Sequence, residues 1–171
     1  MRLREVREGD ASELLGLMTR IDSETEFMLL EAGERQTTVE EHRERIKGVV
    51  ARDNQTILVA ESEGRLVGYL AAIGAPSRRV RHRAYVAVGV LQAFTGRGVG
   101  TRLFEELEAW ARRHGVSRLE LTVRTDNKRG TRLYEKMGFE VEGVKKRSLR
   151  VSHGYVDEYY MARLLPPDEP G

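Results

Sequence analysis

Three glycines stand at alternate positions in the stretch "TGRGVG", from Thr95 to Gly100. An apolar run precedes them and a helical pattern with Leu103 and Leu107 follows, which predicts a strand-to-helix turn. The first turn of a helix offers unpaired N–H groups and the positive end of the helix dipole. Glycines let an anion approach those groups closely. We interpret the stretch as an anion site suited to a pyrophosphate; the alternative is a tight turn without a ligand.

Two familiar nucleotide-binding loops do not fit this spacing. A P-loop carries Lys and then Ser or Thr after its last glycine, whereas Gly100 is followed by Thr101 and Arg102. A dinucleotide fingerprint has the spacing G-x-G-x-x-G and an acid at the end of the next strand. Here the spacing is G-x-G-x-G, and Glu120 lies near the start of its predicted strand. The pattern therefore favours another kind of phosphate ligand.

A further glycine, Gly89, interrupts the apolar strand "YVAVGVLQ". A lone glycine in a strand indicates a bulge or a close backbone approach. A bulge would leave N–H and C=O groups free to hold an extended arm of the same ligand. The alternative is a glycine that is tolerated where two elements cross at a crowded point. The sequence leaves both interpretations open.

A third group lies in "TDNKRGTRLYEKMGF", where Asn127 and Tyr134 are seven residues apart. Two helical turns place them on one face, with Gly130 between them on nearly the same side. A glycine inside a helix costs about 1 kcal/mol relative to Ala, which a close contact would explain. The alternatives are that Asn127 is a simple N-cap and that Tyr134 is a core aromatic with a solvated hydroxyl.

Composition narrows the class of protein. The chain has 171 residues, 29 basic and 27 acidic, with a net charge of +2 and no Cys. Thiolate nucleophiles and thiolate metal sites are therefore excluded, and the near-balanced charge argues against a nucleic-acid partner. The charged start "MRLREVREGD" and the lack of a long apolar run predict a cytoplasmic protein without a membrane partner. No metal is expected.

The elements that must position these residues follow from periodicity. Strands are predicted at 3–10, in a hairpin at 55–76 that turns at Glu63-Gly64, and at 84–94, 118–124, 139–151 and 155–165. Helices are predicted after Asp10, at 37–50, from the glycines to His114, and at 127–137, with the acidic segment 22–38 as a loop with a short helix. This order predicts a mixed α/β sheet in a single domain, residues 1–165, followed by a loose tail at 166–171.

The chain resembles the GNAT superfamily of acetyl-CoA-dependent N-acetyltransferases. "TGRGVG" is similar to the family signature Gln/Arg-x-x-Gly-x-Gly/Ala, with Thr95 in place of the Gln or Arg. Asn127, Gly130, Tyr134 and the Gly138-Phe139 pair resemble the later signature, with Gly130 in place of Ala. The resemblance implies a mostly antiparallel mixed sheet of about seven strands flanked by helices, and acetyl-CoA as the acetyl donor.

The resemblance also implies residue roles. N–H groups from Gly96 to Thr101 would bind the CoA pyrophosphate, with Arg97 and Arg102 nearby to supply positive charge. Main-chain groups of Val88 to Val90 would hold the pantetheine arm and polarise the thioester carbonyl. Asn127 would contact the pantetheine, and Tyr134 would act as general acid beside the sulfur. The cofactor-binding prediction comprises Val88, Gly89, Val90, Thr95, Gly96, Arg97, Gly98, Val99, Gly100, Thr101 and Asn127, and the catalytic one Tyr134.

Acceptor residues are predicted less directly. Glu24 and Glu26 lie in an acidic segment that borders the acceptor site in this family, and His82 precedes the strand that carries Gly89. A solvated acidic face and a solvated basic loop are the alternatives. A water molecule could also serve as the base.

The predicted function is transfer of an acetyl group to a primary amine: a small amine, polyamine, amino acid, protein N-terminus or Lys. The competing hypothesis is a non-catalytic acyl-CoA-binding module of the same fold, which would have no need of Tyr134. A third, nucleic-acid binding through "RRVRHR" and "VKKRSLRV", lacks interleaved aromatic residues. A homodimer is expected because dimers are common in the family.

Overall fold

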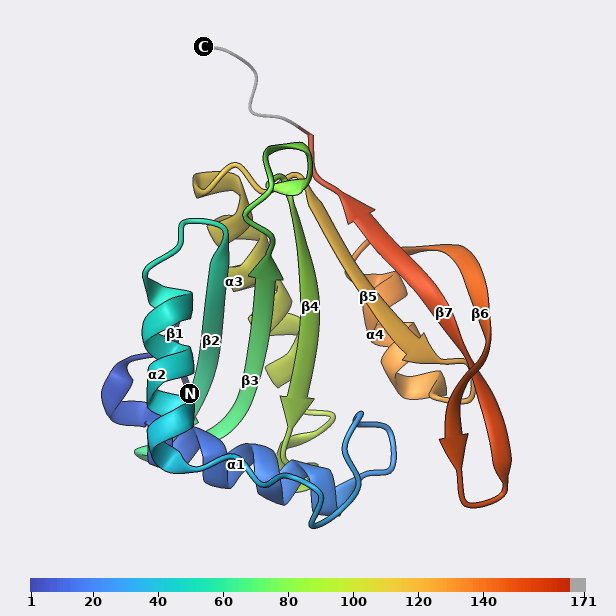
Figure 1. Cartoon of the computed structure of the whole chain (residues 1–171), viewed down its shortest axis with the longest axis horizontal. Coiled ribbons are helices and arrows are strands. Elements are labelled where there is room, and N and C mark those ends of the chain that lie inside the picture. Colours follow the sequence, from blue (N-terminus) through green and yellow to red (C-terminus); the bar gives the residue numbers. More distant parts are fainter. Residues whose placement is uncertain (167–171) are drawn as a thin grey trace.

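A computed structural model describes residues 1–166 of the chain. Its centre is a seven-stranded mixed sheet in the order β1-β2-β3-β4-β5-β7-β6 (Figure 1). All neighbouring strands are antiparallel except β4 and β5, which are parallel. The strands are β1 (Arg2–Glu5), β2 (Gln55–Ser62), β3 (Arg65–Gly74), β4 (Arg83–Val90), β5 (Arg118–Arg124), β6 (Glu140–Val151) and β7 (Gly154–Leu164). The predicted α/β fold with a mostly antiparallel sheet of seven strands is confirmed.

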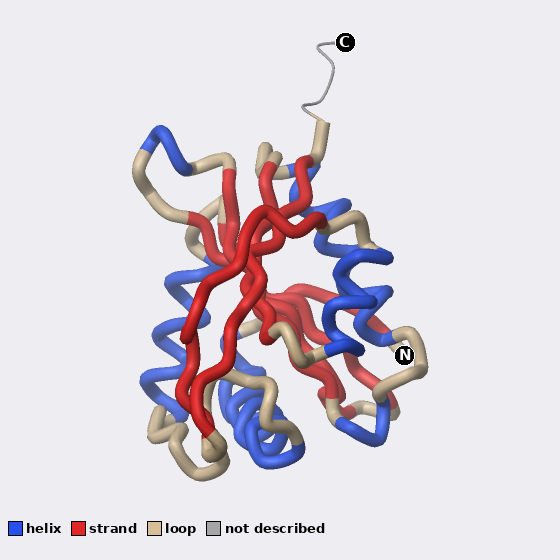
Figure 2. The backbone as a smooth tube through the Cα atoms, turned by 90° about the vertical axis from the view of Figure 1, so that its right-hand side faces the viewer, coloured by secondary structure: helices blue, strands red, loops and turns tan. Residues whose placement is uncertain are grey.

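Helices cover both faces of the sheet (Figures 1 and 2). They are α1 (Ala11–Glu24), α2 (Val39–Val50), α3 (Val99–Arg113) and α4 (Lys128–Lys136). In Figure 1, α1 and α2 lie in front of the first four strands, and α3 and α4 lie behind the sheet. None of the helices among residues 1–166 has the length and apolar character needed to span a bilayer.

Local signals place most boundaries where the sequence predicts them. Thr38 and Glu41 form a reciprocal capping box at the start of α2, as expected. Glu63 and Gly64 turn the β2–β3 hairpin with φ of 51° and 76°. Gly115 follows α3 with φ of 67°, the conformation that favours glycine after a helix.

The acidic segment between α1 and α2 differs from the prediction. Residues 25–38 contain turns and bends but no helix. Side-chain contacts hold this connection instead: Asp22 of α1 accepts two hydrogen bonds from Arg35, at 2.7 Å from Nε and 3.2 Å from Nη2. Because periodicity reports only a helix or strand face, it does not reveal a segment held by side chains. Most of the predicted tail, 167–171, lies outside the described residues.

The core lies between the sheet and the helices on each side. On α3, the predicted apolar face is buried, and it packs behind β2, β3 and β4. Its members are Leu103, Phe104, Leu107, Trp110 and Ala111. This packing fixes the start of α3, and hence the glycine loop, relative to the end of β4.

On the other face of the sheet, one buried side chain has a nitrogen without a hydrogen-bond partner among residues 1–166. His42 of α2 is 3% exposed, and its Nε2 makes no hydrogen bond within residues 1–166. Burial lowers the pKa of this imidazole, and the charges of Arg45 and Arg35 lower it further. A buried unsatisfied group costs about 1–3 kcal/mol.

We therefore expect His42→Leu to raise the free energy of unfolding by about 1 kcal/mol at neutral pH. In the unaltered protein, the His42 imidazole takes up a proton near pH 6.5 when the chain is unfolded, but only at a lower pH when it is folded. Stability should then fall as the pH drops below about 6.5, and His42→Leu should flatten that fall. Urea unfolding at pH 5.5 and 7.5 measures both effects, with His153→Gln as a surface control. A steeper loss in the variant would contradict the assignment.

Candidate functional site

The glycine loop joins the end of β4 to α3 in a conformation that leaves main-chain donors free. Gly96 and Gly98 have φ of 74° and 78°, and Gly98 is the N-cap of α3. The first helical hydrogen bond to the cap runs from the N–H of Arg102 to the carbonyl of Gly98 at 3.0 Å. Within residues 1–166, the N–H groups from Gly96 to Thr101 donate to no acceptor. This is the free donor set that an anion site requires.

Each glycine of the loop also has a local structural reason. Gly96 and Gly98 adopt a left-handed conformation that residues with a Cβ rarely take. At Gly100 φ is not positive, but a Cβ would lie 2.9 Å from Cδ2 of Leu133 on α4. The third glycine therefore allows α3 and α4 to pack closely. The free N–H groups, rather than the number of glycines, are the stronger argument for an anion site.

Several cations surround the loop. Arg129 of α4 reaches over Gly96, where a Cβ would lie 2.9 Å from its Nη2. Lys136 of α4 donates to the hydroxyl of Thr101 at 3.4 Å. Together with Arg97 and Arg102, these side chains make no ion pair within the described residues. Unpaired cations near free N–H groups favour a polyanionic ligand.

Thr95 does not take the place of a longer polar side chain. Its hydroxyl donates to the carbonyl of Gln92 at 2.7 Å, which closes the preceding turn. Arg129 brings a guanidinium to the loop from another element. No pattern in the sequence singles out Arg129, because only the packing between α3 and α4 brings it to the loop.

The parallel strands β4 and β5 separate beside this loop. Their pairing covers Arg83–Tyr85 with Arg118–Glu120 and then ends (Figure 1). The N–H of Leu91 donates to the carbonyl of Val67 on β3 at 2.9 Å. Because main-chain groups alternate in direction along a strand, those of every second residue before Leu91 also point toward β3. The polar main-chain groups of Val88 and Val90 therefore point toward the open side. They form a free strand edge that leads from the glycine loop into the gap.

Of the two interpretations of Gly89, the bulge is wrong. Pairing between β3 and β4 is regular from Gly68–Val90 to Gly74–Ala84, with no shift at Gly89. A Cβ on Gly89 would lie 2.8 Å from Cε1 of Tyr69 and 3.2 Å from Cδ1 of Ile21 on α1. The tight-crossing interpretation therefore holds. The free main-chain groups result from the separation of β4 and β5, which no local sequence signal reports.

This crowding predicts the result of Gly89→Ala. Because the ring of Tyr69 is 3% exposed and cannot move freely, the added methyl should destabilise the fold by about 1–3 kcal/mol. Urea unfolding measures the loss. In the Tyr69→Leu background the same substitution should cost much less, and an equal cost in both backgrounds would contradict the contact.

Asn127 and Gly130 form the start of α4. Oδ1 of Asn127 accepts a hydrogen bond from the N–H of Gly130 at 2.9 Å, so Asn127 is an N-cap. A Cβ on Gly130 would lie 2.6 Å from Nδ2 of Asn127. The glycine is thus explained by the cap itself, and the amide nitrogen of Asn127 remains the group that can face a ligand.

Tyr134 of α4 packs its ring edge-on to Phe104 of α3, with 5.7 Å between the ring centres. Its hydroxyl makes no hydrogen bond within the described residues. Burial raises the pKa of Tyr134 to about 12, and the phenols of Tyr85 and Tyr69 add to the shift. Both of those side chains belong to the face that carries α1, whereas α4 lies on the other face. With its pKa raised, the Tyr134 phenol stays protonated at neutral pH.

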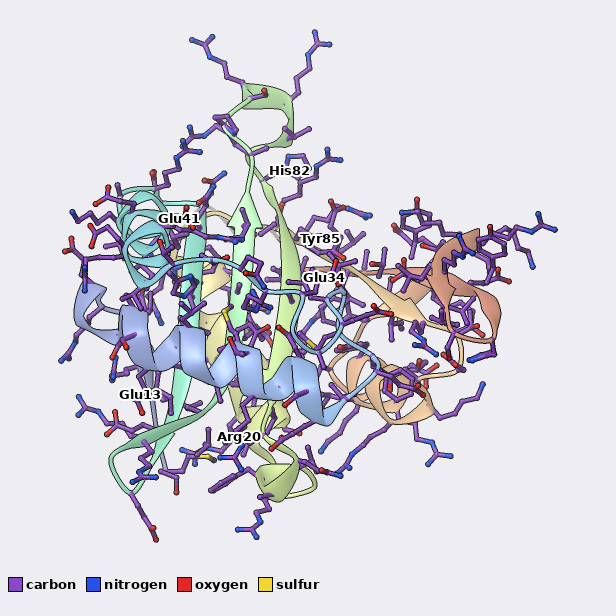
Figure 3. The ribbon with its side chains drawn as sticks, turned by 60° about the horizontal axis from the view of Figure 1, so that its bottom comes forward. Glu13, Arg20, Glu34, Glu41, His82 and Tyr85 are labelled. Carbon is purple, nitrogen blue, oxygen red and sulfur yellow. The ribbon has the colours of Figure 1, made fainter. Side chains whose placement is uncertain are left out.

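The predicted acceptor residues occupy three different environments. Glu24 accepts hydrogen bonds from the N–H of Gln92 at 2.8 Å and from Arg20 at 3.0 Å, which ties α1 to the end of β4. Glu26 has an exposed side chain, and its carbonyl accepts from Arg124. His82 is exposed beside the loop before β4 (Figure 3). The length of β4 puts His82 about 25 Å from the glycine loop, so the structure brings Glu26, but not His82, to the open end.

Two further contacts near the gap were missed by the sequence analysis. The Tyr85 hydroxyl of β4 is 2.7 Å from the Thr122 hydroxyl of β5, just beyond the last paired residues. Arg124, at the end of β5, is 3% exposed and carries a charge. Its position after an apolar strand, followed closely by Asp126, was the available signal. Among residues 1–166, no group of His, Asp and Glu side chains is arranged to hold a metal ion.

Comparison with solved structures defines the class. An acetyltransferase of the GNAT family from Streptococcus pneumoniae superposes with a TM-score of 0.93 and 31% identity, over 96% of this chain and 99% of that one. YncA from Salmonella typhimurium, solved with its cofactor acetyl-CoA, has a TM-score of 0.87 at 19% identity over 100% of this chain and 97% of that one, a likeness of fold. The fold is that of the GNAT acyltransferases.

Sequence comparison gives the family. The model of the Acetyltransferase (GNAT) family matches residues 18–139. L-amino acid N-acetyltransferase AaaT of Escherichia coli is 38% identical over 63% of this chain and 67% of its own length. N-alpha-acetyltransferase RimI of Mycobacterium tuberculosis is 44% identical over 61% of this chain and 63% of its own length, less than two thirds of that relative. The chain belongs to the GNAT family and is an N-acetyltransferase.

Proposed function

We propose that this protein transfers the acetyl group of acetyl-CoA directly to the primary amine of an acceptor within a ternary complex. The observation that carries the proposal is the free edge of β4, which leads from the unpaired N–H groups of the glycine loop into the gap between β4 and β5. An extended thioester with a pyrophosphate at one end matches that sequence of groups. Acetyl-CoA supplies the activated acetyl group.

Each part of the site has a chemical task in this proposal. The N–H groups from Gly96 to Thr101, with Arg129 and Lys136, bind the pyrophosphate. An outward N–H of Val88 or Val90 donates to the thioester oxygen as negative charge develops there. The amine nitrogen forms a bond to the carbonyl carbon, the carbon–sulfur bond breaks, and Tyr134 gives its proton to the departing sulfur. The proton lost by the amine leaves through water.

The names of the relatives support an α-amine as the acceptor, either of an amino acid or of a protein N-terminus. Polyamines and lysine side chains are the other acceptors to compare. Glu26, exposed at the open end, suits an ammonium group as it arrives, whereas the pairing of Glu24 favours a structural role. An acyl-CoA-binding module without catalysis would have no use for a protonated phenol.

A thiol-release assay with acetyl-CoA tests the proposed function. The panel should contain free amino acids, amino-acid amides, short peptides with free N-termini, and spermidine. We expect turnover with at least one α-amine and none with the corresponding N-acetylated compounds. Tight binding of acetyl-CoA without turnover of any amine would overturn the proposal.

Two other expectations remain part of the proposal. The homodimer is tested by light scattering of the purified protein, with a mass near twice that of the 19.5 kDa chain expected. The cytoplasmic location is tested by fractionation of cells that express the full chain.

A further inference from the structure

The connection between α1 and α2, residues 25–38, is fastened to the end of β5 by Arg124. Nε and Nη2 of Arg124 donate to the two carboxylate oxygens of Asp126 at 2.9 and 2.8 Å. Nη1 donates to the main-chain carbonyl of Glu26 at 2.9 Å. The guanidinium thus joins two segments that lie 98 positions apart in the chain. A planar group with donors in a fixed fork can do this, whereas the single ammonium of Lys cannot.

This fastening leads to an aromatic side chain at the mouth of the gap. Phe27 lies over the Arg124 guanidinium, with 4.9 Å between the ring centre and Cζ, and it is 38% exposed. At the other end of the connection, Arg35 is paired with Asp22 on α1. The connection contains no helix, but Arg124 holds it near its start and Arg35 holds it near its end. These contacts fix the position of Phe27.

Phe27 and two exposed tyrosines, Tyr85 and Tyr160, lie on the side of the sheet that carries α1. Arg124 and Thr122 are two positions apart on β5 and share a face. Thr122 touches the Tyr85 hydroxyl at 2.7 Å and is paired across the strands with Tyr160 of β7. Tyr85 and Tyr160 are 45% and 46% exposed.

No helix among the described residues covers this part of β5, β7 and β6 in front (Figure 1). In Figure 3, Tyr85 and the connection that carries Glu34 appear on the same side of the molecule. The surface formed by Phe27, Tyr85 and Tyr160 is therefore open, and it adjoins the gap into which the free edge of β4 faces.

We propose that Phe27, Tyr85 and Tyr160 form the pocket for the side chain next to the reacting amine, and that Arg124 is the positioning residue that holds Phe27 there. The occupant is the apolar side chain of an acceptor such as leucine or methionine, as an amino acid or as the first residue of a peptide. The inference rests on the proposed function and adds the class of acceptor. Aromatic rings give a large apolar contact, and Glu26 and Asp126 lie at its edge, where the ammonium group of the acceptor would enter.

The test compares acceptors that differ only in this side chain: leucinamide, methioninamide, alaninamide and serinamide. Phe27→Ala should lower kcat/KM for leucinamide and methioninamide about tenfold, the effect of losing one buried aromatic contact. The values for alaninamide and serinamide, and the KM for acetyl-CoA, should change less than about twofold. Phe27→Leu should restore most of the loss. Leu29→Ala is the matched control, since Leu29 is a 78% exposed apolar residue of the same connection.

Arg124→Lys tests the positioning role. It should raise the KM for leucinamide and abolish the preference for leucinamide over alaninamide, while kcat with saturating alaninamide stays within about twofold. Equal losses for all four acceptors in Phe27→Ala, or a preserved preference in Arg124→Lys, would overturn the inference and leave the proposed function intact. Failure of the unaltered protein to use any amine would overturn both.

Discussion

Replacing Tyr134 with Phe is expected to lower kcat about 100-fold and to leave the affinity for acetyl-CoA unchanged. The variant removes the proton donor but keeps the ring that packs against Phe104 and Phe139. Because the ring contacts persist, the melting temperature should stay the same. Steady-state kinetics with a saturating α-amine, together with calorimetric titration of acetyl-CoA, separates the chemical step from binding.

The pKa of Tyr134 gives this prediction a second measurement. A phenol with a pKa of about 12 keeps its proton throughout the neutral and moderately alkaline range. Loss of the general acid should therefore begin only as the pH approaches 12, so this group should impose no fall in kcat between pH 7 and 10. Tyr155→Phe is the matched control, since Tyr155 is 59% exposed in the β6–β7 hairpin. Full activity of Tyr134→Phe would assign this residue to packing alone.

Placing a carboxylate at Gly98 is expected to weaken acetyl-CoA binding about 10- to 100-fold relative to placing an amide there. Gly98 has φ of 78°, which Asn and Asp tolerate better than other side chains, and a Cβ there meets no atom within 4 Å. Gly98→Asp and Gly98→Asn should therefore fold alike. They differ in a negative charge at the N-terminus of α3, where a pyrophosphate would lie.

Isothermal titration at low and high salt measures the difference between these two variants, and it should shrink as salt screens the added charge. Acetylpantetheine, which lacks the pyrophosphate, should be used equally well by both. Equal affinities of Gly98→Asp and Gly98→Asn for acetyl-CoA at low salt would show that the pyrophosphate binds elsewhere.

Several structural features followed from short-range sequence signals. The capping box of Thr38 and Glu41, the turn at Glu63-Gly64 and the N-cap Asn127 each depend on residues within a few positions of one another. The apolar face of α3 likewise follows from a period of 3.6 residues. Such signals depend only on neighbouring residues and not on the tertiary fold, so they can be recognised in a single sequence.

The glycines show what such local signals leave out, namely the distant side chain that each glycine accommodates. The strand pattern around Gly89 left a bulge and a tight crossing equally open, and the ring of Tyr69, twenty positions away on β3, decides for the crossing. Gly100 was assigned to an anion, yet it also makes room for Leu133 of α4. A glycine in the sequence states that a side chain is absent without stating which neighbour requires the absence.

The sequence by itself determined the order of the elements, the strand-to-helix glycine loop and the family, because these depend on local patterns. Tertiary structure alone decided how far β4 and β5 stay paired, that Arg129 reaches the glycine loop, and that Arg124 fastens the α1–α2 connection. These contacts join residues far apart in the chain, and their energies exist only after the sheet has formed. The gap between β4 and β5, on which the proposed chemistry depends, is therefore a property of the folded sheet rather than of any one segment.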